Sequence, residues 1–274
     1  MTTPFVEANG ARIPAIGLGT WDLRERTCVR MVEQALRLGY RMIDTAEMYG
    51  NEREVGEGIH ASGIPRAQVF VTTKVWPDHL APREFERATK ESLAKLKFSE
   101  VDLLLIHWPN PRIPLADTIG ALCRMKREGF TRHIGVSNFT VELLEQAVKL
   151  ATEPLVTDQF EWHPFIDQTK VVEACRRHGL AVTAYSPLAR GRVLSDKTLQ
   201  RIGVQHDKTA AQVGLRWLVQ RGAIVIPRSS RPEGLAANFS IFDFELSPAE
   251  MTEIARLSHP RGRIVDWSGA PDWD

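Results

Sequence analysis

The feature that most constrains the fold of this 274-residue chain is a repeated alternation of apolar runs with helix-like segments. Eight short runs are expected to form strands, and most are apolar at consecutive positions rather than at alternate ones. Continuous apolar runs are typical of parallel strands that are covered on both faces. The runs end near residues 43, 71, 106, 136, 157, 184, 226 and 244, the last of them being Ile241–Phe244.

Polar residues follow the first four runs at a nearly constant spacing. Asp44, Lys74, His107 and Ser137 are separated by 30, 33 and 30 residues. Eight strand–helix units within about 250 residues are typical of a (β/α)8 TIM barrel. A doubly wound parallel sheet is the alternative, but no glycine-rich phosphate-binding turn follows the first run. The sequence therefore predicts an α/β fold of the (β/α)8 TIM barrel class.

The N-terminal segment predicts a separate element. Residues 5–7 and 12–14 flank an Asn9-Gly10 pair, which is a strong signal for a tight β-hairpin turn. We expect this N-terminal β-hairpin to close one end of the barrel. The Gly17-Leu18-Gly19 segment that follows is a weak phosphate-binding signal, because no strand-to-helix context accompanies it. No linker or change of composition divides the chain, so residues 1–274 are expected to form a single domain.

The first long helix is predicted to precede Gly39. Cys28, Met31, Ala35 and Leu38 recur at helical spacing, and Gly39 stands where a C-terminal helix cap is expected. These four side chains are therefore expected to pack against the strands. Trp217 lies on a similar helical stretch and is predicted to belong to the core rather than to a binding site.

Composition excludes several classes of protein. The net charge of +1 provides no overall field that would favour nucleic acid or an anionic membrane. No apolar run approaches the length that spans a bilayer, and the N-terminus has no signal-peptide pattern. Cys28, Cys123 and Cys175 are too few and too scattered for a disulfide framework or a metal cluster, and the first two are expected in the core. We therefore expect a cytoplasmic protein without a metal, whose partner is a small molecule.

Polar side chains that can transfer protons gather at the predicted strand ends. In a (β/α)8 barrel the chemistry lies where the strands meet the loops that follow them. Tyr49, five residues beyond Asp44, would join this group at the same mouth. Each member taken alone has an ordinary structural explanation, but together they would converge on one site. The group comprises Asp44, Tyr49, Lys74, His107, Ser137, Asn138, Gln159, Tyr185 and Arg228.

Four of these residues form a coherent acid–base set. A phenol has an ordinary pKa of about 10, which is too high for a good acid near neutral pH. An ammonium close to Tyr49 would lower that pKa, and a carboxylate would keep the ammonium charged; Lys74 and Asp44 suit these roles. His107 could donate a hydrogen bond to a carbonyl oxygen. With a hydride donor nearby, the set predicts reduction of a carbonyl to an alcohol.

Two stretches carry a resemblance to the aldo-keto reductase family. Residues 39–56 resemble the first family signature, with Met42 where the family usually has His, and residues 132–139 (RHIGVSNF) resemble the second. The similarity extends from Gly17 nearly to the C-terminus. It implies a catalytic tetrad of Asp44, Tyr49, Lys74 and His107, all of which are present.

The resemblance also implies NADP(H) as the cofactor and assigns residues to its binding. Ser137, Asn138 and Gln159 would bind the nicotinamide carboxamide, and Tyr185 would stack on the ring. The whole implied cofactor set is Thr20, Trp21, Asp44, Ser137, Asn138, Gln159, Tyr185, Ser186, Leu188, Arg190, Arg228, Ser229, Arg231 and Asn238. The substrate pocket would consist of Trp21, Met48, Trp76, His107, Trp108 and Trp267.

The chain departs from the family pattern at the site for the 2′-phosphate of NADP. Arg228, Ser229 and Asn238 match that pattern, but Gly234 replaces the expected second arginine, for which Arg231 could compensate. Within the family, the short length and residues 270–274 are most similar to the bacterial 2,5-diketo-D-gluconate reductases. The resemblance thus implies an NADPH-dependent reductase of aldehydes and ketones, with 2,5-diketo-D-gluconate or methylglyoxal as substrates.

Two other classes of function are compatible with a barrel of this kind. A non-catalytic NADP(H)-binding sensor or regulatory protein would not need the acid together with its supporting lysine and aspartate. A barrel isomerase or hydrolase would need paired carboxylates or metal ligands, which the strand ends do not offer. The sequence favours the reductase, and we expect it to be a monomer.

Overall fold

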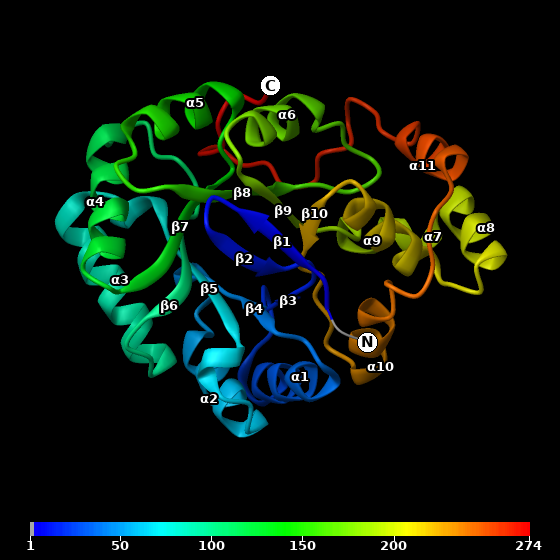
Figure 1. Ribbon diagram of the computed structural model, residues 1–274, viewed down its shortest axis with the longest axis horizontal. Helices are drawn as coiled ribbons and strands as arrows, with labels where there is room; N and C mark the ends of the chain where they lie inside the picture. The colour runs from blue at the N-terminus through cyan, green and yellow to red at the C-terminus, as the bar shows by residue number, and fades with distance from the viewer. Residues whose placement is uncertain (1–2) are drawn as a thin grey trace.

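The computed structural model describes residues 3–274 and confirms the predicted α/β barrel (Figure 1). Eight parallel strands form one sheet in the order β10-β9-β8-β7-β6-β5-β4-β3. The sheet also closes on itself, because Ile16 forms a parallel bridge with Val225 of β10 and Gly17 N donates to Val225 O at 2.9 Å. A closed sheet places the carboxyl ends of all eight strands at one mouth.

The strands of the barrel alternate with helices that surround it (Figure 1). The strands are β3 (Leu18–Gly19), β4 (Met42–Asp44), β5 (Phe70–Val75), β6 (Val101–Ile106), β7 (Thr131–Ser137), β8 (Leu155–Glu161), β9 (Ala181–Tyr185) and β10 (Ala223–Val225). The helices are α1 (Glu25–Leu38), α2 (Glu52–Ser62), α3 (Pro82–Leu96), α4 (Leu115–Arg127), α5 (Val141–Leu150), α6 (Thr169–Arg177), α7 (Arg192–Ser195), α8 (Lys197–Gln205), α9 (Ala210–Gln220), α10 (Pro232–Phe239) and α11 (Pro248–Ala255).

The predicted N-terminal hairpin is confirmed and closes one end of the barrel. Strands β1 (Phe5–Ala8) and β2 (Ala11–Pro14) pair in antiparallel fashion around Asn9 and Gly10, whose φ angles of 43° and 85° are those of a tight hairpin turn. Figure 1 shows this hairpin lying across the barrel. Its Ile13 is buried in a small cluster with inward-facing residues such as Leu103. The opposite end of the barrel is therefore the open mouth.

One predicted strand is wrong. Residues 241–244 form no strand, and the eighth strand of the barrel is β3, which pairs in parallel with β4. The apolar character of residues 241–244 has another cause, since Ile241 is buried and Phe244 packs against His206 outside the sheet. Strand β3 is too short to show a periodic pattern. Gly19 within it is required by close packing, because a Cβ there would lie 2.6 Å from the carbonyl oxygen of Ile226.

Helix α1 is confirmed, but its buried face differs in one residue from the prediction. Gly39 caps the helix with φ 116°, as expected. Leu38, however, is 43% exposed, and the buried stripe is completed by Val32 and Leu36. All three cysteines are buried, and Trp217 is a core residue as predicted. In residues 3–274 no helix is both long enough and apolar enough to cross a membrane.

Candidate active site

A buried ion pair lies at the open mouth of the barrel, beside the predicted proton donor. Lys74 Nζ is 2.6 Å from Asp44 Oδ1, donates to the carbonyl oxygen of Thr45 at 2.9 Å, and lies 3.3 Å from the Tyr49 hydroxyl. Lys74 and Asp44 are 0% and 1% exposed. The structure therefore brings the predicted acid, ammonium and carboxylate into direct contact.

Strand register explains why these side chains meet. Asp44 of β4 pairs with Thr72 of β5, so the two side chains share a face of the sheet. Side chains two positions apart on a strand also share a face, which places Lys74 on that face one step closer to the mouth. Beyond Asp44 a short 3-10 turn, η1 (Glu47–Tyr49), ends at Gly50 with φ 65° and carries the tyrosine back over the strand end.

Both carboxylate oxygens of Asp44 are occupied. Oδ1 accepts from Lys74, and Oδ2 accepts from Gln159 Nε2 at 2.8 Å. The main-chain oxygen of Asp44 accepts from the Thr20 hydroxyl at 2.9 Å. Because hydrogen bonds to a charged group are strong and directional, these contacts fix the position of the carboxylate and, through it, of the ammonium.

The tyrosine is held in its protonated form. Burial raises the pKa of Tyr49 well above its ordinary value, and the nearby Asp44 carboxylate raises this pKa further. The sequence predicted a net lowering of this pKa by Lys74, but the net shift is upward, because desolvation of a phenolate outweighs the attraction of the ammonium. Burial also lowers the pKa of Lys74, while Asp44 opposes that shift.

His107 is a neutral imidazole beside the tyrosine. Burial lowers its pKa well below the ordinary value, and the Lys74 ammonium lowers it further. Its ring lies edge-on to the ring of Tyr49, with centroids 5.6 Å apart, and edge-on to Trp76 at 5.2 Å. A neutral imidazole has one N–H group to donate, so His107 is able to hydrogen-bond an oxygen at the mouth.

A chain of hydrogen bonds links the amides and hydroxyls at the ends of β7, β8 and β9. Asn138 Nδ2 donates to His107 O at 2.9 Å and to Ser137 Oγ at 3.0 Å. Ser137 Oγ donates to Gln159 O at 2.6 Å, and the Tyr185 hydroxyl donates to Asn138 Oδ1 at 2.8 Å. The four residues that were predicted to surround the nicotinamide therefore hold one another in place beside the tetrad.

Aromatic side chains wall the mouth. The Trp21 ring is edge-on to Tyr49 at 5.1 Å, and Trp267 stacks on Trp76 at 5.7 Å and lies edge-on to Trp108 at 5.8 Å. Trp21, Met48 and Trp267 are 45%, 39% and 42% exposed, which is unusual for large apolar side chains. An exposed apolar rim of this kind is typical of a ligand-binding cleft.

Two residues at the mouth were missed by the sequence analysis. Trp273 lies edge-on to Trp108 at 5.9 Å and so extends the aromatic wall. Glu47 ties the tyrosine-bearing turn to that wall, since Oε2 accepts from Trp76 N at 2.9 Å and Oε1 lies 2.6 Å from His79 Nδ1. The position of Glu47 two residues before the tyrosine is the only sequence signal for this contact.

The loop after β9 has an unusual backbone. Ser186, Ala189 and Arg190 have φ angles of 48°, 47° and 51°. Left-handed backbone is uncommon outside glycine and concentrates where a loop must hold a defined shape for function. Leu188 lies within this loop, and Asn238 is buried on α10. The predicted cofactor residues of this region therefore lie on one tightly bent segment and on the helix after β10.

The segment between β10 and α10 carries the remaining predicted cofactor residues. Arg228 is half-exposed and its Nη2 lies 3.7 Å from Asp22 Oδ2. Ser229 Oγ donates to Arg231 O at 2.8 Å and accepts from Arg231 N at 3.1 Å. A Cβ at Gly234 would collide with Ser229 Oγ. Gly234, which stands where the family pattern has arginine, thus leaves space for the turn that the Ser229 side chain forms with the backbone of Arg231.

Fold and site together define a (β/α)8 barrel enzyme with a buried acid–base centre. A model of the aldo/keto reductase family matches residues 15–259 of the chain. The methylglyoxal reductase DkgB of Salmonella typhi is 41% identical over 266 residues, which cover 96% of this chain and 99% of the relative. The chain belongs to the aldo/keto reductase family and is an NADP(H)-dependent oxidoreductase that reduces carbonyl groups.

Solved structures agree with this assignment. A crystal structure provisionally assigned as 2,5-diketo-D-gluconic acid reductase B is 48% identical, covers 100% of this chain and 98% of its own, and superposes with a TM-score of 0.98. An aldo-keto reductase of Bombyx mori in complex with NADP is 33% identical, with coverage of 100% and 98% and a TM-score of 0.91. In residues 3–274, no group of three His, Cys, Asp or Glu residues could hold a metal ion.

Proposed function

We propose that this enzyme reduces methylglyoxal, 2,5-diketo-D-gluconate and similar small carbonyl compounds, with Tyr49 as the proton donor. The observation that carries the proposal is the approach of Lys74 Nζ to within 3.3 Å of the Tyr49 hydroxyl, while the same ammonium is 2.6 Å from Asp44. Relatives named methylglyoxal reductase, and a neighbouring structure assigned to 2,5-diketo-D-gluconic acid, support these substrates.

Each residue of the tetrad has a distinct role in this reaction. Bound NADPH would supply the hydride for the carbonyl carbon. The Tyr49 phenol remains protonated at neutral pH and gives its proton to the carbonyl oxygen. The Lys74 ammonium stabilises the phenolate that is left, and Asp44 holds the ammonium in place. The neutral His107 imidazole donates a hydrogen bond that orients the same carbonyl oxygen.

The residues at the mouth fit a nicotinamide. Gln159 gives an N–H to Asp44, and among residues 3–274 no group donates to its Oε1, so this oxygen is able to accept from a carboxamide N–H. Tyr185 presents a half-buried ring whose orientation is fixed through its hydroxyl by Asn138. The bent loop at residues 186–190 would lie along the pyrophosphate, and Arg228, Ser229, Arg231 and Asn238 would bind the adenosine 2′-phosphate end.

The experiment that tests the function follows the absorbance of NADPH with a panel of aldehydes and ketones. Methylglyoxal, 2,5-diketo-D-gluconate and a simple aldehyde form the panel. We expect NADPH to be consumed with the first two, and their kcat/KM values to exceed that of the simple aldehyde. Tight binding of NADPH without turnover of any compound would instead support the non-catalytic sensor.

The cofactor preference depends on Arg228. A guanidinium binds phosphate oxygens with two parallel hydrogen bonds, and the contacts that Arg228 makes to Asp22 are long, at 3.5 Å to its main-chain oxygen and 3.7 Å to Oδ2. We expect NADPH to be preferred over NADH, though less strongly than in relatives with an arginine at the position of Gly234. Arg228→Ala is expected to lower kcat/KM with NADPH about 10–100-fold, because a hydrogen bond to a charged group contributes about 1.5–3 kcal/mol.

Measuring kcat/KM for both cofactors decides this prediction. With NADH, the kcat/KM of the Arg228→Ala variant is expected to stay close to that of wild type. Arg201→Ala is a matched control, since this exposed arginine on α8 pairs with Glu253 away from the mouth. An equal loss with NADPH and NADH would show that Arg228 does not recognise the 2′-phosphate.

We further propose that residues 1–274 form a single domain that works as a monomer in the cytoplasm, without nucleic acid or membrane as a partner. Support comes from the mouth, because the acid, its lysine and the aromatic wall all belong to one chain. Sedimentation equilibrium is expected to give one species near the chain mass of 30.8 kDa. A stable dimer at micromolar concentration would contradict the monomer.

A further inference from the structure

Glu161 is a buried carboxylate that the acid–base centre does not use. It ends β8 and is 0% exposed. Its Oε2 accepts from Val265 N at 2.7 Å, and its Oε1 accepts from Ile264 N at 2.8 Å and lies 2.9 Å from His163 Nε2. Hydrogen bonds from N–H groups to a carboxylate are roughly twice as strong as neutral ones. Glu161 therefore fixes a segment that lies more than 100 positions away in the sequence.

The segment that Glu161 holds is the C-terminal tail, residues 262–274. This tail contains no helix or strand, so no ladder of helical or sheet hydrogen bonds holds it in place. It enters beside the loop after β8, where a Cβ at Gly262 would collide with the carbonyl oxygen of Phe165. Terminal segments stay ordered only where specific contacts hold them. The paired backbone amides bound by Glu161 supply such a contact at the start of the tail.

The tail forms one wall of the active-site mouth. Trp267, two residues beyond Val265, stacks on Trp76 and lies edge-on to Trp108. Near the end of the chain, the Arg263 guanidinium lies 3.5 Å from the centre of the Trp273 ring. The last contact is at the N-terminus of α5, where an Asp274 carboxylate oxygen accepts from Val141 N at 2.9 Å.

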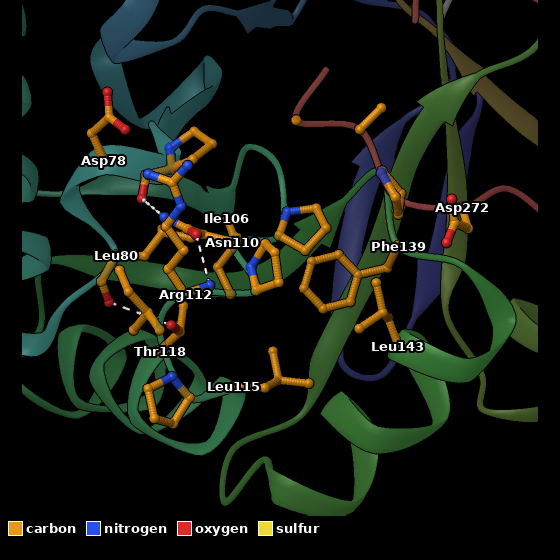
Figure 2. A pocket seen from close by; sticks show the side chains of 18 of the residues that line it. Asp78, Leu80, Ile106, Asn110, Arg112, Leu115, Thr118, Phe139, Leu143 and Asp272 are labelled. Atoms are coloured by element: carbon orange, nitrogen blue, oxygen red, sulfur yellow. Dashed lines mark hydrogen bonds between the residues drawn. The ribbon is translucent and has the colours of Figure 1, made fainter. Parts of the chain in front are cut away.

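Trp267 also lines a second space. A cavity of about 650 Å³ lies between the β6–α4 loop, the start of α5 and the tail (Figure 2). Asn110, Arg112 and Phe139 line it from the barrel side, and Trp267 and Asp272 line it from the tail. A displaced tail would therefore change the shape of this cavity as well as that of the mouth.

We propose that Glu161 is a positioning residue that holds the tail against the barrel and thereby determines which carbonyl substrates the mouth accepts. The inference on substrates rests on the proposed reductase function, whereas the anchoring of the tail does not. Substrates with an apolar group large enough to reach Trp267 depend on the tail. A substrate as small as methylglyoxal depends on the tetrad, which Glu161 does not contact among its hydrogen bonds.

Glu161→Gln tests the proposal, because it keeps the size of the side chain but replaces one acceptor oxygen with an NH2 group. One tail amide then loses its acceptor and faces a donor. With phenylglyoxal, which differs from methylglyoxal by a phenyl in place of a methyl group, we expect KM to rise about 10-fold. With methylglyoxal we expect kcat to stay within about twofold of wild type, since the proton donor is unchanged.

A double-mutant cycle shows whether Glu161 acts through Trp267. Trp267→Ala alone is expected to raise the KM for phenylglyoxal by a similar factor. The double variant Glu161→Gln/Trp267→Ala is then expected to have a KM for phenylglyoxal no higher than that of either single variant, because the effects of residues that act through one contact do not add. Additive losses would show that Glu161 affects the substrate by another route.

Trypsin digestion tests the anchor without any activity measurement. Arg261 and Arg263 adjoin the anchor, so a released tail is expected to be cut there about 10-fold faster in Glu161→Gln than in wild type. Asp102→Asn is the matched control: Asp102 is also buried and accepts a backbone N–H, from Val71 at 2.9 Å, but far from the tail. This control is expected to lose stability without faster cleavage of the tail.

A second variant removes the contact from the tail side. Val265→Pro deletes the N–H group that donates to Glu161 Oε2 and leaves the residues of the barrel unchanged. It therefore tests the anchor even if Glu161→Gln does not fold. Wild-type cleavage rates and an unchanged KM for phenylglyoxal in either variant would overturn the proposal. If the wild-type enzyme turned over no aldehyde, the proposed function would fail, but the cleavage rates would still test the anchor.

Discussion

Tyr49→Phe is expected to lower kcat for carbonyl reduction by about 10²–10⁴-fold and to leave the affinity for NADPH nearly unchanged. The phenylalanine ring keeps the edge contacts of Tyr49 with Trp21 and His107. Only the hydroxyl next to the Lys74 ammonium is lost, and with it the proton that Tyr49 would give to the carbonyl oxygen. Steady-state kinetics with methylglyoxal and a fluorescence titration with NADPH check both halves of this result.

The other two tyrosines of the chain are matched controls. Tyr40 is buried, has its pKa raised by burial and donates to Leu235 O at 3.0 Å, so Tyr40→Phe is expected to cost about 0.5–1.5 kcal/mol of stability without loss of kcat. Tyr185→Phe removes the bond to Asn138 and is expected to weaken NADPH binding more than it lowers kcat. Retention of more than a tenth of wild-type kcat by Tyr49→Phe would show that another group supplies the proton.

The fold could be predicted from the sequence wherever a strand was long enough to show a pattern. Runs such as Leu103–Ile106 are apolar at every position, and that property separates parallel barrel strands from solvent-facing ones. Strand β3 has only Leu18 and Gly19, so its pairing with β4 leaves no periodic trace. The run at 241–244 was mistaken for a strand because apolar packing outside the barrel produces the same composition.

The gathering of site residues was predictable for a geometric reason. Parallel strands in a closed barrel bring their carboxyl ends to one mouth, so residues at the strand ends meet whatever their separation in the sequence. Lys74 and Gln159 both reach Asp44 for this reason, although they lie 30 and 115 residues from it.

Other properties of the site require the three-dimensional structure. The direction of the Tyr49 pKa depends on whether burial or the ammonium dominates, and burial is not visible in a sequence. The bond from the tail to Glu161 joins irregular segments, and no periodicity marks a polar contact of that kind. Likewise, the missing arginine at Gly234 is evident in the sequence, but its close approach to Ser229 is not.

Lys74→Met is expected to lower kcat by about 10²–10³-fold, because it removes the charge that stabilises the phenolate of Tyr49 during proton transfer. It also leaves the buried Asp44 carboxylate without a positively charged partner, since Gln159 remains as its one side-chain partner in residues 3–274. Breaking a buried pair by removing one partner costs about 3–5 kcal/mol. Thermal unfolding is therefore expected to begin at a clearly lower temperature than in wild type.

Adding Asp44→Asn to Lys74→Met separates stability from catalysis. The double variant has no buried charge left without a partner, so much of the lost stability is expected to return while kcat stays low. Recovery of kcat together with stability would mean that Lys74 supports the fold alone and has no part in proton transfer.

The pH dependence of alcohol oxidation shows in which direction Lys74 shifts the pKa of Tyr49. Oxidation requires the Tyr49 phenolate, so its rate is expected to rise with pH over the alkaline range in wild type, where burial and Asp44 hold the pKa of Tyr49 above its ordinary value. The ammonium favours the phenolate and the carboxylate disfavours it, so removing Lys74 alone raises this pKa further. The rise in oxidation rate is then expected to move to higher pH in Lys74→Met, and an unmoved profile would show that Lys74 does not set the pKa of the proton donor.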